Sequence, residues 1–235
     1  MSLFNRIIKF IGLVLLVIGV NVMPMILIGN QSKTPIMLQW VFGLLYLVLA
    51  FLIIRKVWKT YLKKEDYKIT GRPFTLEELG IAVLFFFGAR LVAVVGTLLL
   101  QKLTGNAMSA NDAALQASAS DLKNMFPLYF VAFQVMIGFF APVLEELTFR
   151  GFFSRYFFKK DNKWAKWLVS SLIFALMHAF KPIELIMYFA LGSVFFFAFR
   201  REENIRDSIV VHMMNNGLIV IFSVFNYILL LMGVI

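Results

Sequence analysis

Long apolar runs separated by short polar segments dominate this sequence. The runs cover residues 10–29, 36–54, 79–100, 126–144, 167–180, 183–199 and 208–235. Most of them approach the roughly 20 residues that a helix needs to cross the hydrocarbon core of a bilayer. The pattern therefore predicts an all-α polytopic bundle of about seven transmembrane helices, or eight if the long last run divides.

The segments between the runs carry local signals of their own. Thr75, followed by Glu77 and Glu78, predicts a helix start with a capping box. Segment 101–124 is polar and rich in small residues, so we expect an exposed loop with at most a helical turn. The first run could be a signal peptide or a retained helix. We expect a retained helix, because the run is nearly long enough to span and no small-residue cleavage site follows it.

Composition agrees with a membrane protein. The chain has 235 residues, of which 61% are hydrophobic and only 15% are charged, whereas about a quarter of a soluble domain is charged. There is no cysteine, which excludes disulfides, thiolate metal ligands and thiol nucleophiles. We see no repeat and no second domain, so residues 1–235 are expected to form one membrane domain.

The net charge of +10 has a simple explanation in membrane topology. If the N-terminus is cytoplasmic and the spans alternate, 17 of the 23 Lys and Arg residues fall on the cytoplasmic side and four on the other. The remaining two, Arg90 and Arg150, lie within the membrane. This asymmetry follows the positive-inside rule and requires no nucleic-acid partner. We therefore expect a multi-pass protein of the cell membrane with a cytoplasmic N-terminus.

Two adjacent carboxylates, Glu145 and Glu146, interrupt one of the most apolar regions. Charges in hydrocarbon are costly and usually face a partner or a cavity. On a helix, Glu146 and Arg150 are four residues apart and share a face, so they can neutralise each other. Glu145 points about 100° away and is free to act chemically. A purely structural ion pair that holds the bundle together explains the same residues.

His178 lies inside the fifth apolar run, where a lone histidine is more often a hydrogen-bonded core residue than a ligand. Its depth argues for more. Counting back to the basic segment at about 1.5 Å per residue places Glu145 and His178 both roughly 20 Å from the cytoplasmic edge. We therefore expect the two side chains to lie level on neighbouring antiparallel helices.

The second histidine, His212, is four residues before Asn216, so the two share a helix face; this spacing does not select Asn215. A polar stripe that seals a helix interface is the plain alternative. Arg90 is the remaining intramembrane cation. We expect it to pair with a carboxylate, with Glu145 or Glu146 as candidates, and count it among the supporting residues.

A glutamate, two histidines and an asparagine at one depth suit hydrolysis. A glutamate can take a proton from water, and a His/Asn pair can donate hydrogen bonds to a carbonyl oxygen that becomes negative. Two histidines and one glutamate also match a catalytic zinc ligand set, here Glu145, His178 and His212. The His-Glu-x-x-His signature is absent. A zinc-dependent and a metal-free mechanism therefore both stay open.

These residues form three motifs in order along successive helices: Glu145-Glu146-x-x-x-Arg150, Phe174-x-x-x-His178 and His212-x-x-x-Asn216. The set resembles the three motifs of the CPBP family, which comprises the CAAX proteases and bacteriocin-processing proteins and is also called the Abi family. The resemblance covers residues 126–222. Residues 121–235 thus resemble the catalytic core, whereas residues 1–120 resemble the family only in being membrane helices.

The resemblance implies an intramembrane endopeptidase whose site opens to the cytoplasm. Glu145 would activate water, and His178 would assist it or ligate a metal. His212 and Asn216 would form the oxyanion site, or His212 would be a ligand. The expected supporting residues are Glu146 and Arg150.

The resemblance leaves the substrate open between a peptide and a membrane protein, and implicates bacteriocin self-immunity or peptide maturation. A non-catalytic scaffold or immunity protein that binds a peptide or partner in the same cavity is the main alternative. A transporter is a further one, against which the chain offers no inverted repeat. The sequence does not set the oligomeric state.

Overall fold

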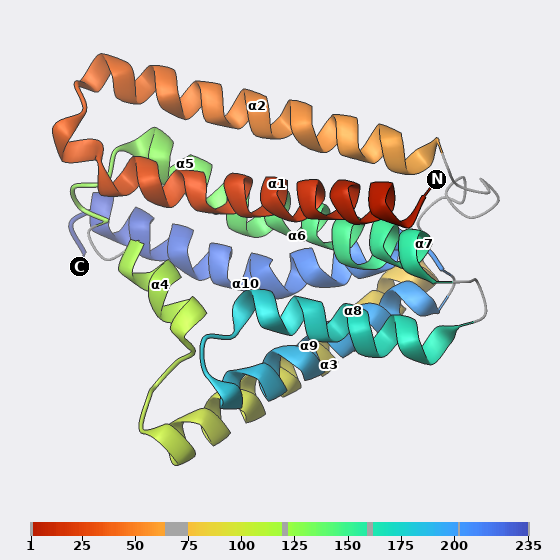
Figure 1. The fold of residues 1–235 in the computed structure, drawn as a ribbon. Helices are drawn as coiled ribbons and strands as arrows, with labels where there is room; N and C mark the ends of the chain where they lie inside the picture. The colour runs from red at the N-terminus through yellow and green to blue at the C-terminus, as the bar shows by residue number, and fades with distance from the viewer. Residues whose placement is uncertain (1, 64–74, 119–121, 159–161, 202, 235) are drawn as a thin grey trace.

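A computed structural model describes residues 2–63, 75–118, 122–158, 162–201 and 203–234. These residues form helices joined by short connections, with no strand among them (Figure 1). The all-α prediction is confirmed.

The N-terminal half supplies three long helices and one short one. They are α1 (Leu3–Gly29), α2 (Ile36–Leu62), α3 (Leu76–Thr104) and α4 (Ala110–Ser118), with a 3-10 turn, η1 (Gln31–Lys33), between the first two. The predicted capping box is present at the start of α3. The Thr75 hydroxyl accepts a hydrogen bond from the Glu78 N–H, and the Glu78 carboxylate accepts one from the Thr75 N–H.

The charged region forms one helical rod, Pro127–Phe157, in which two π-helical stretches interrupt the α-helix. Its parts are α5 (Pro127–Val135), η2 (Met136–Phe140), α6 (Ala141–Glu146), η3 (Leu147–Phe152) and α7 (Phe153–Phe157). The rod is the most buried of the long apolar helices, with 67% of its most apolar window inside the structure against 11% for α3. It is therefore the centre around which the other helices pack.

Three helices complete the chain: α8 (Lys163–His178), α9 (Pro182–Arg200) and α10 (Ile205–Leu231). Figure 1 shows α1 and α2 on one side of the rod and α10 on the other, with α8, α9 and α3 packed together beyond α10. Two buried apolar clusters form the core, one around the rod and one between α3, α8, α9 and α10.

Within the part of the chain that the structure describes, six helices are long and apolar enough to cross a membrane: α1, α2, α3, the rod, α9 and α10. The predicted fifth span is α8, which has 16 residues and reaches only about 24 Å at 1.5 Å per residue. The expectation of about seven spans is thus close. The last apolar run is a single helix over its described residues, so the eighth span does not form there.

Segment 101–124 differs from the exposed loop that its composition predicted. The last turn of α3 and the helix α4 occupy much of it, and α4 is fastened to α9. The hydroxyls of Ser109 and Tyr188 are 2.7 Å apart, and the N–H of Ala110 donates to the buried carboxylate of Glu184 over 2.8 Å. These tertiary bonds order a segment whose own composition is that of a loop.

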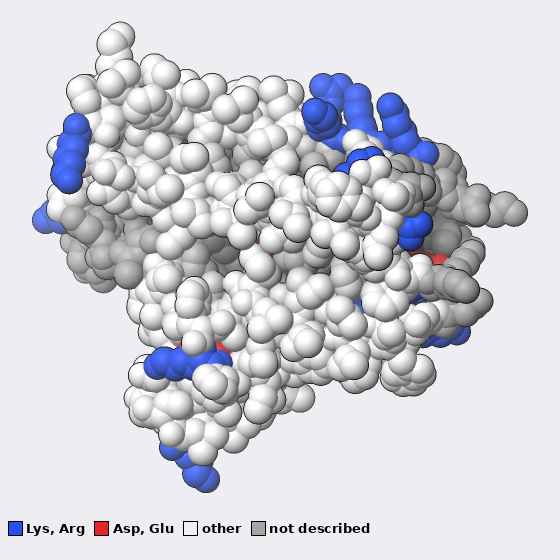
Figure 2. Space-filling model, in the orientation of Figure 1, with Lys and Arg blue, Asp and Glu red and all other residues white. Residues whose placement is uncertain are grey.

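Charged side chains gather at the ends of the helices. Figure 2 shows Lys and Arg side chains toward both ends of the visible face, with a broad band between them that lacks such side chains. Large exposed apolar residues are numerous on the outer helices, among them Leu44, Leu84 and Phe222. An apolar band between charged ends is the surface that a bilayer requires.

Candidate active site

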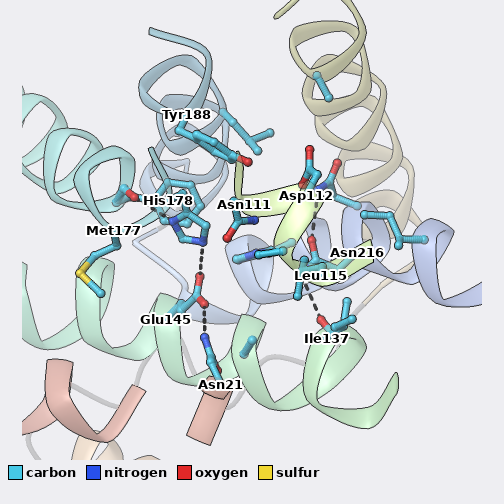
Figure 3. A pocket seen from close by; sticks show the side chains of 18 of the residues that line it. Asn21, Asn111, Asp112, Leu115, Ile137, Glu145, Met177, His178, Tyr188 and Asn216 are labelled. Atoms are coloured by element: carbon cyan, nitrogen blue, oxygen red, sulfur yellow. Dashed lines mark hydrogen bonds and ion pairs between the residues drawn. The ribbon is translucent and has the colours of Figure 1, made fainter. Parts of the chain in front are cut away.

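The predicted site residues meet at a cavity of about 770 Å³ between the rod, α1, α3, α4, α8, α9 and α10 (Figure 3). Its polar lining residues are Asn21, Arg90, Thr97, Asn111, Asp112, Glu145, His178, Tyr188, His212, Asn215 and Asn216. Five of the predicted residues therefore line one space: Arg90, Glu145, His178, His212 and Asn216. The other two, Glu146 and Arg150, lie behind its wall with no exposed surface.

Glu145 is held between two polar neighbours. Its Oε1 accepts a hydrogen bond of 2.8 Å from the side-chain amide of Asn21 on α1. Its Oε2 has no hydrogen-bond donor among the described residues and lies 3.5 Å from Nε2 of His178. Figure 3 shows the carboxylate between these two side chains. The level placement of Glu145 and His178 expected from residue counting is what the structure shows.

The backbone carbonyl of Phe174 fixes the tautomer of His178. Nδ1 of His178 lies 2.8 Å from that carbonyl oxygen, and the ring stacks on the Phe174 ring at 4.3 Å. A carbonyl can only accept, so Nδ1 carries a hydrogen. In the neutral ring, Nε2 is then an acceptor that faces the carboxylate Oε2. Two facing acceptors are complementary to a shared proton or to a hydrogen-bearing group such as water.

Glu146 connects the first motif to the third. Its Oε1 forms an ion pair with Nη1 of Arg150 over 3.1 Å and accepts a hydrogen bond from Nδ1 of His212 over 3.0 Å. Nη2 of Arg150 also donates to the carbonyl of Gly192 over 2.9 Å. The predicted Glu146–Arg150 pair is therefore present. Because a carboxylate can only accept, Glu146 also sets the tautomer of His212, with the hydrogen on Nδ1. The His212 ring stacks on Phe195 at 4.3 Å, which fixes its plane.

Among the described residues Arg90 pairs with no carboxylate, so the expected ion pair with Glu145 or Glu146 does not form. Its Nη1 donates over 3.2 Å to the side-chain oxygen of Asn215, and the side-chain N–H of Asn215 donates over 3.2 Å to the side-chain oxygen of Asn216. Asn216 then donates over 3.0 Å to the backbone carbonyl of Ile137 (Figure 3). Both glutamates contact residues of α1, α8, α10 and the rod, and Arg90 donates to the side-chain amide of Asn215 instead.

Several residues of the cavity were not singled out from the sequence. Asn215 follows His212 by three residues, a spacing that also shares a helix face and could have indicated it. Asn21 is a polar residue in the middle of an apolar run, which is itself a signal of function in a membrane helix. Asn111 and Asp112 lie on α4, and no pattern in the sequence indicates that α4 reaches the cavity.

The expected zinc ligands do not assemble as a set of three. Among the residues that the structure describes, no three His, Cys, Asp or Glu side chains lie close enough together to hold a metal ion. Glu145 and His178 are adjacent, and Glu146 holds Nδ1 of His212, which leaves Nε2 as the nitrogen of His212 that could face a metal. The described side chains do not come together as the three-ligand set, and no chemical step below is routed through a metal.

Comparisons with known proteins point to one family. Residues 127–218, from the start of the rod to the middle of α10, match the family model described as Type II CAAX prenyl endopeptidase Rce1-like. The membrane-embedded CAAX protease MroQ of Staphylococcus aureus (strain USA300) is 32% identical over 205 residues, which are 83% of this chain and 76% of that protein. The chain belongs to the CAAX protease family of intramembrane endopeptidases. It is accordingly a multi-pass membrane protein.

Other relatives of this CAAX-protease-family chain match over shorter stretches. The UPF0177 protein YbdI of Lactococcus lactis is 29% identical over 109 residues, 46% of this chain and 58% of YbdI. The putative membrane peptidase YdiL of Bacillus subtilis is 35% identical over 83 residues, 35% of this chain and 34% of YdiL. No solved structure matches the chain.

Proposed function

We propose that the protein hydrolyses a peptide bond by activating water at Glu145, with His178 as its partner and with His212 and Asn216 at the oxyanion. The observation that carries the proposal is the arrangement of the Glu145 carboxylate. One oxygen is fixed by Asn21, and the other faces Nε2 of His178 without a hydrogen-bond donor of its own. A water molecule at Oε2 would have one acceptor on each side.

The chemical steps follow from these positions. Glu145 takes a proton from the water as it attacks the carbonyl carbon, and a positioned general base of this kind contributes about 10²–10⁴-fold to the rate. The protonated Glu145 then returns the proton to the leaving amine, and the peptide C–N bond breaks. His178, 3.5 Å away, accepts a hydrogen bond from the same water through Nε2 and so orients it.

The negative carbonyl oxygen needs donors on the opposite side of the cavity. Asn216 has one side-chain N–H on the carbonyl of Ile137 and a second N–H to offer. His212 lines the cavity with its Nδ1 bound to Glu146, so that its Nε2 donates only when the ring is protonated. Removing one such donor from an oxyanion site costs about 10²–10³-fold in kcat.

For the substrate we propose a peptide or a membrane-associated protein, because the cavity lies among apolar helices and has a volume of about 770 Å³. We also propose that the N-terminus is cytoplasmic and that the site is reached from the cytoplasmic side, on the basis of the distribution of Lys and Arg in the sequence. Bacteriocin self-immunity and peptide maturation are the two roles that we put forward for the reaction.

A proteomic comparison tests the function and identifies the substrate together. Membrane peptides are compared between cells that express the wild-type chain and cells that express Glu145→Gln. The matched control is Glu77→Gln, which removes an exposed carboxylate at the start of α3. We expect cleavage products that are present with wild type and Glu77→Gln and absent with Glu145→Gln. Equal product sets in all three would instead support a binding protein that uses the same cavity.

A further inference from the structure

A hydrogen-bonded relay crosses the cavity wall from α3 to the central rod. It begins at Arg90 on α3, passes through the side chains of Asn215 and Asn216 on α10, and ends at the carbonyl of Ile137 in the rod. The three hydrogen bonds measure 3.2, 3.2 and 3.0 Å. Three elements that are distant in the sequence are thus connected at the asparagine that we place at the oxyanion.

The two ends of this relay dictate the direction of every hydrogen bond in it. A guanidinium can only donate, so Asn215 presents its oxygen to Arg90 and its amide group to Asn216. Asn216 must then present its oxygen to Asn215. At the other end the carbonyl of Ile137 can only accept, which again requires the amide group of Asn216 on that side. Both ends therefore select the same orientation of the Asn216 side chain.

The carbonyl of Ile137 is available because of the local irregularity of the rod. In an α-helix it would accept from the N–H of Ala141, but that N–H donates to Met136 across the π-helical turn. In the π register the donor to Ile137 would be residue 142, which is a proline and has no N–H. Asn216 satisfies the carbonyl that this leaves. A π-turn followed by proline thus creates the anchor for the relay.

We propose that Arg90 is a positioning residue of the active site: acting through Asn215, it holds Asn216 with its amide group toward the reaction and its oxygen away. The inference rests on the proposed function of Asn216 as an oxyanion donor. If the Asn216 side chain turned over, its oxygen would face the developing negative charge and repel it. A donor-only residue at position 90 opposes this together with the carbonyl of Ile137, whereas a neutral amide there would leave that carbonyl as the one constraint on Asn216.

The environment of Arg90 agrees with such a role. No carboxylate of the described residues lies within ion-pair distance of its guanidinium, although it lies within a membrane-spanning helix and lines the cavity. Its neighbour Asn215 is buried, with 6% of its surface exposed. Charges in such positions are costly and mark functional sites. Because an apolar residue would be cheaper there, removing the charge should leave the fold intact.

Three single variants distinguish the effect of hydrogen-bond direction on activity from the effects of side-chain charge and volume. Arg90→Lys keeps a donor-only cation, Arg90→Met keeps the apolar stem alone, and Asn215→Asp still accepts from Arg90 but has no hydrogen to give Asn216. Each purified variant is assayed with an internally quenched peptide that the wild-type protein cleaves, selected from a mixed peptide pool. Protein yield and thermal unfolding in detergent report on folding.

We expect Arg90→Lys to keep a kcat close to that of wild type. We expect Arg90→Met and Asn215→Asp to lower kcat about tenfold or more with KM little changed, as part of the roughly 10²–10³-fold that one oxyanion donor contributes. All three should fold in normal yield. Equal kcat for Arg90→Met and wild type would overturn the proposal, as would a loss in Arg90→Lys as large as that in Arg90→Met.

A double variant distinguishes positioning from direct contact with the substrate. In an Asn216→Ala background, Arg90→Met should cause no further loss of kcat, because the residue that it positions is gone. If the two losses multiply, Arg90 acts on the substrate directly and the positioning role fails while the proposed function stands. If Asn216→Ala alone cleaves as fast as wild type, the proposed oxyanion site itself fails, and the inference with it.

Discussion

Removal of the positive charge of Arg150 is a perturbation whose effect can be worked out from the structure. Arg150 and Glu146 are both fully buried, with 3.1 Å between Nη1 and Oε1. The guanidinium also lies 4.6 Å above the Phe174 ring and donates to the carbonyl of Gly192. The substitution Arg150→Met keeps most of the side-chain volume but leaves the Glu146 carboxylate with His212 as its remaining partner.

The expected loss of stability is large. Breaking a buried ion pair by removing one partner costs about 3–5 kcal/mol, because a charge stays buried without compensation. For a protein of this size each kcal/mol corresponds to roughly 2–4 °C in Tm, so we expect Tm to fall by about 6–20 °C. A matched control is Lys163→Met, which removes an exposed cation from the start of α8 and should leave the free energy of unfolding within about 0.5 kcal/mol of wild type.

The double variant Glu146→Gln/Arg150→Met separates stability from activity. It removes both buried charges, so we expect Tm to recover toward the wild-type value, since replacing a buried pair by neutral groups is often close to neutral. Activity should not recover, because Nδ1 of His212 no longer donates to a carboxylate. Thermal unfolding in detergent and cleavage of the quenched peptide give the two readouts.

Two results would refute this reasoning. One is a Tm for Arg150→Met that equals that of Lys163→Met, since the pair would then contribute nothing to the fold. The other is a double variant that cleaves the peptide at the wild-type rate, since Glu146 would then have no part in orienting His212.

Further predictions concern the support of the site, the packing of the rod and the metal question. Asn21→Ala should lower kcat about tenfold and also lower Tm, because Glu145 loses the donor to Oε1, a charged-group hydrogen bond of about 1.5–3 kcal/mol; an unchanged kcat would show that Oε1 needs no anchor. Gly151→Ala should destabilise by about 1–3 kcal/mol, because the added Cβ would lie 2.6 Å from the buried Tyr61 ring, whereas Gly80→Ala meets open space and should not destabilise. Activity should survive chelators, and elemental analysis of active protein should find less than one zinc per chain; stoichiometric zinc with loss of activity on chelation would favour the metalloprotease instead.

Much of the fold could be predicted from the sequence alone. The apolar runs predicted the long helices because a bilayer sets a minimum length that few other structures need. The spacing of Glu146 and Arg150 predicted their contact because helix geometry places residues four apart on one face. Counting residues from a charged edge placed Glu145 level with His178 for the same reason, and the π-helical stretch Leu147–Phe152 between them did not move the carboxylate out of reach.

Other features depend on contacts between distant segments, which the hydrophobic periodicity of a single segment does not predict. The partner of Arg90 could not be predicted, because both glutamates had already found neighbours on α1, α8, α10 and the rod. The composition of α4 is that of a loop. Hydrogen bonds from its N-terminal end to Tyr188 and Glu184 on α9 hold it beside the cavity. The irregular backbone before Pro142 is likewise a consequence of three-dimensional packing, and so is the carbonyl of Ile137 that it leaves without a donor from the helix backbone.

The rate of peptide cleavage by purified Glu145→Gln tests the central claim most directly. Gln keeps the shape of the side chain and the contact with Asn21, so the variant should be obtained in wild-type yield with an unchanged Tm. We predict a kcat at least about 10²-fold lower than that of wild type, since the general base is lost. A folded Glu145→Gln protein that cleaves the same peptide at the wild-type rate would contradict the account.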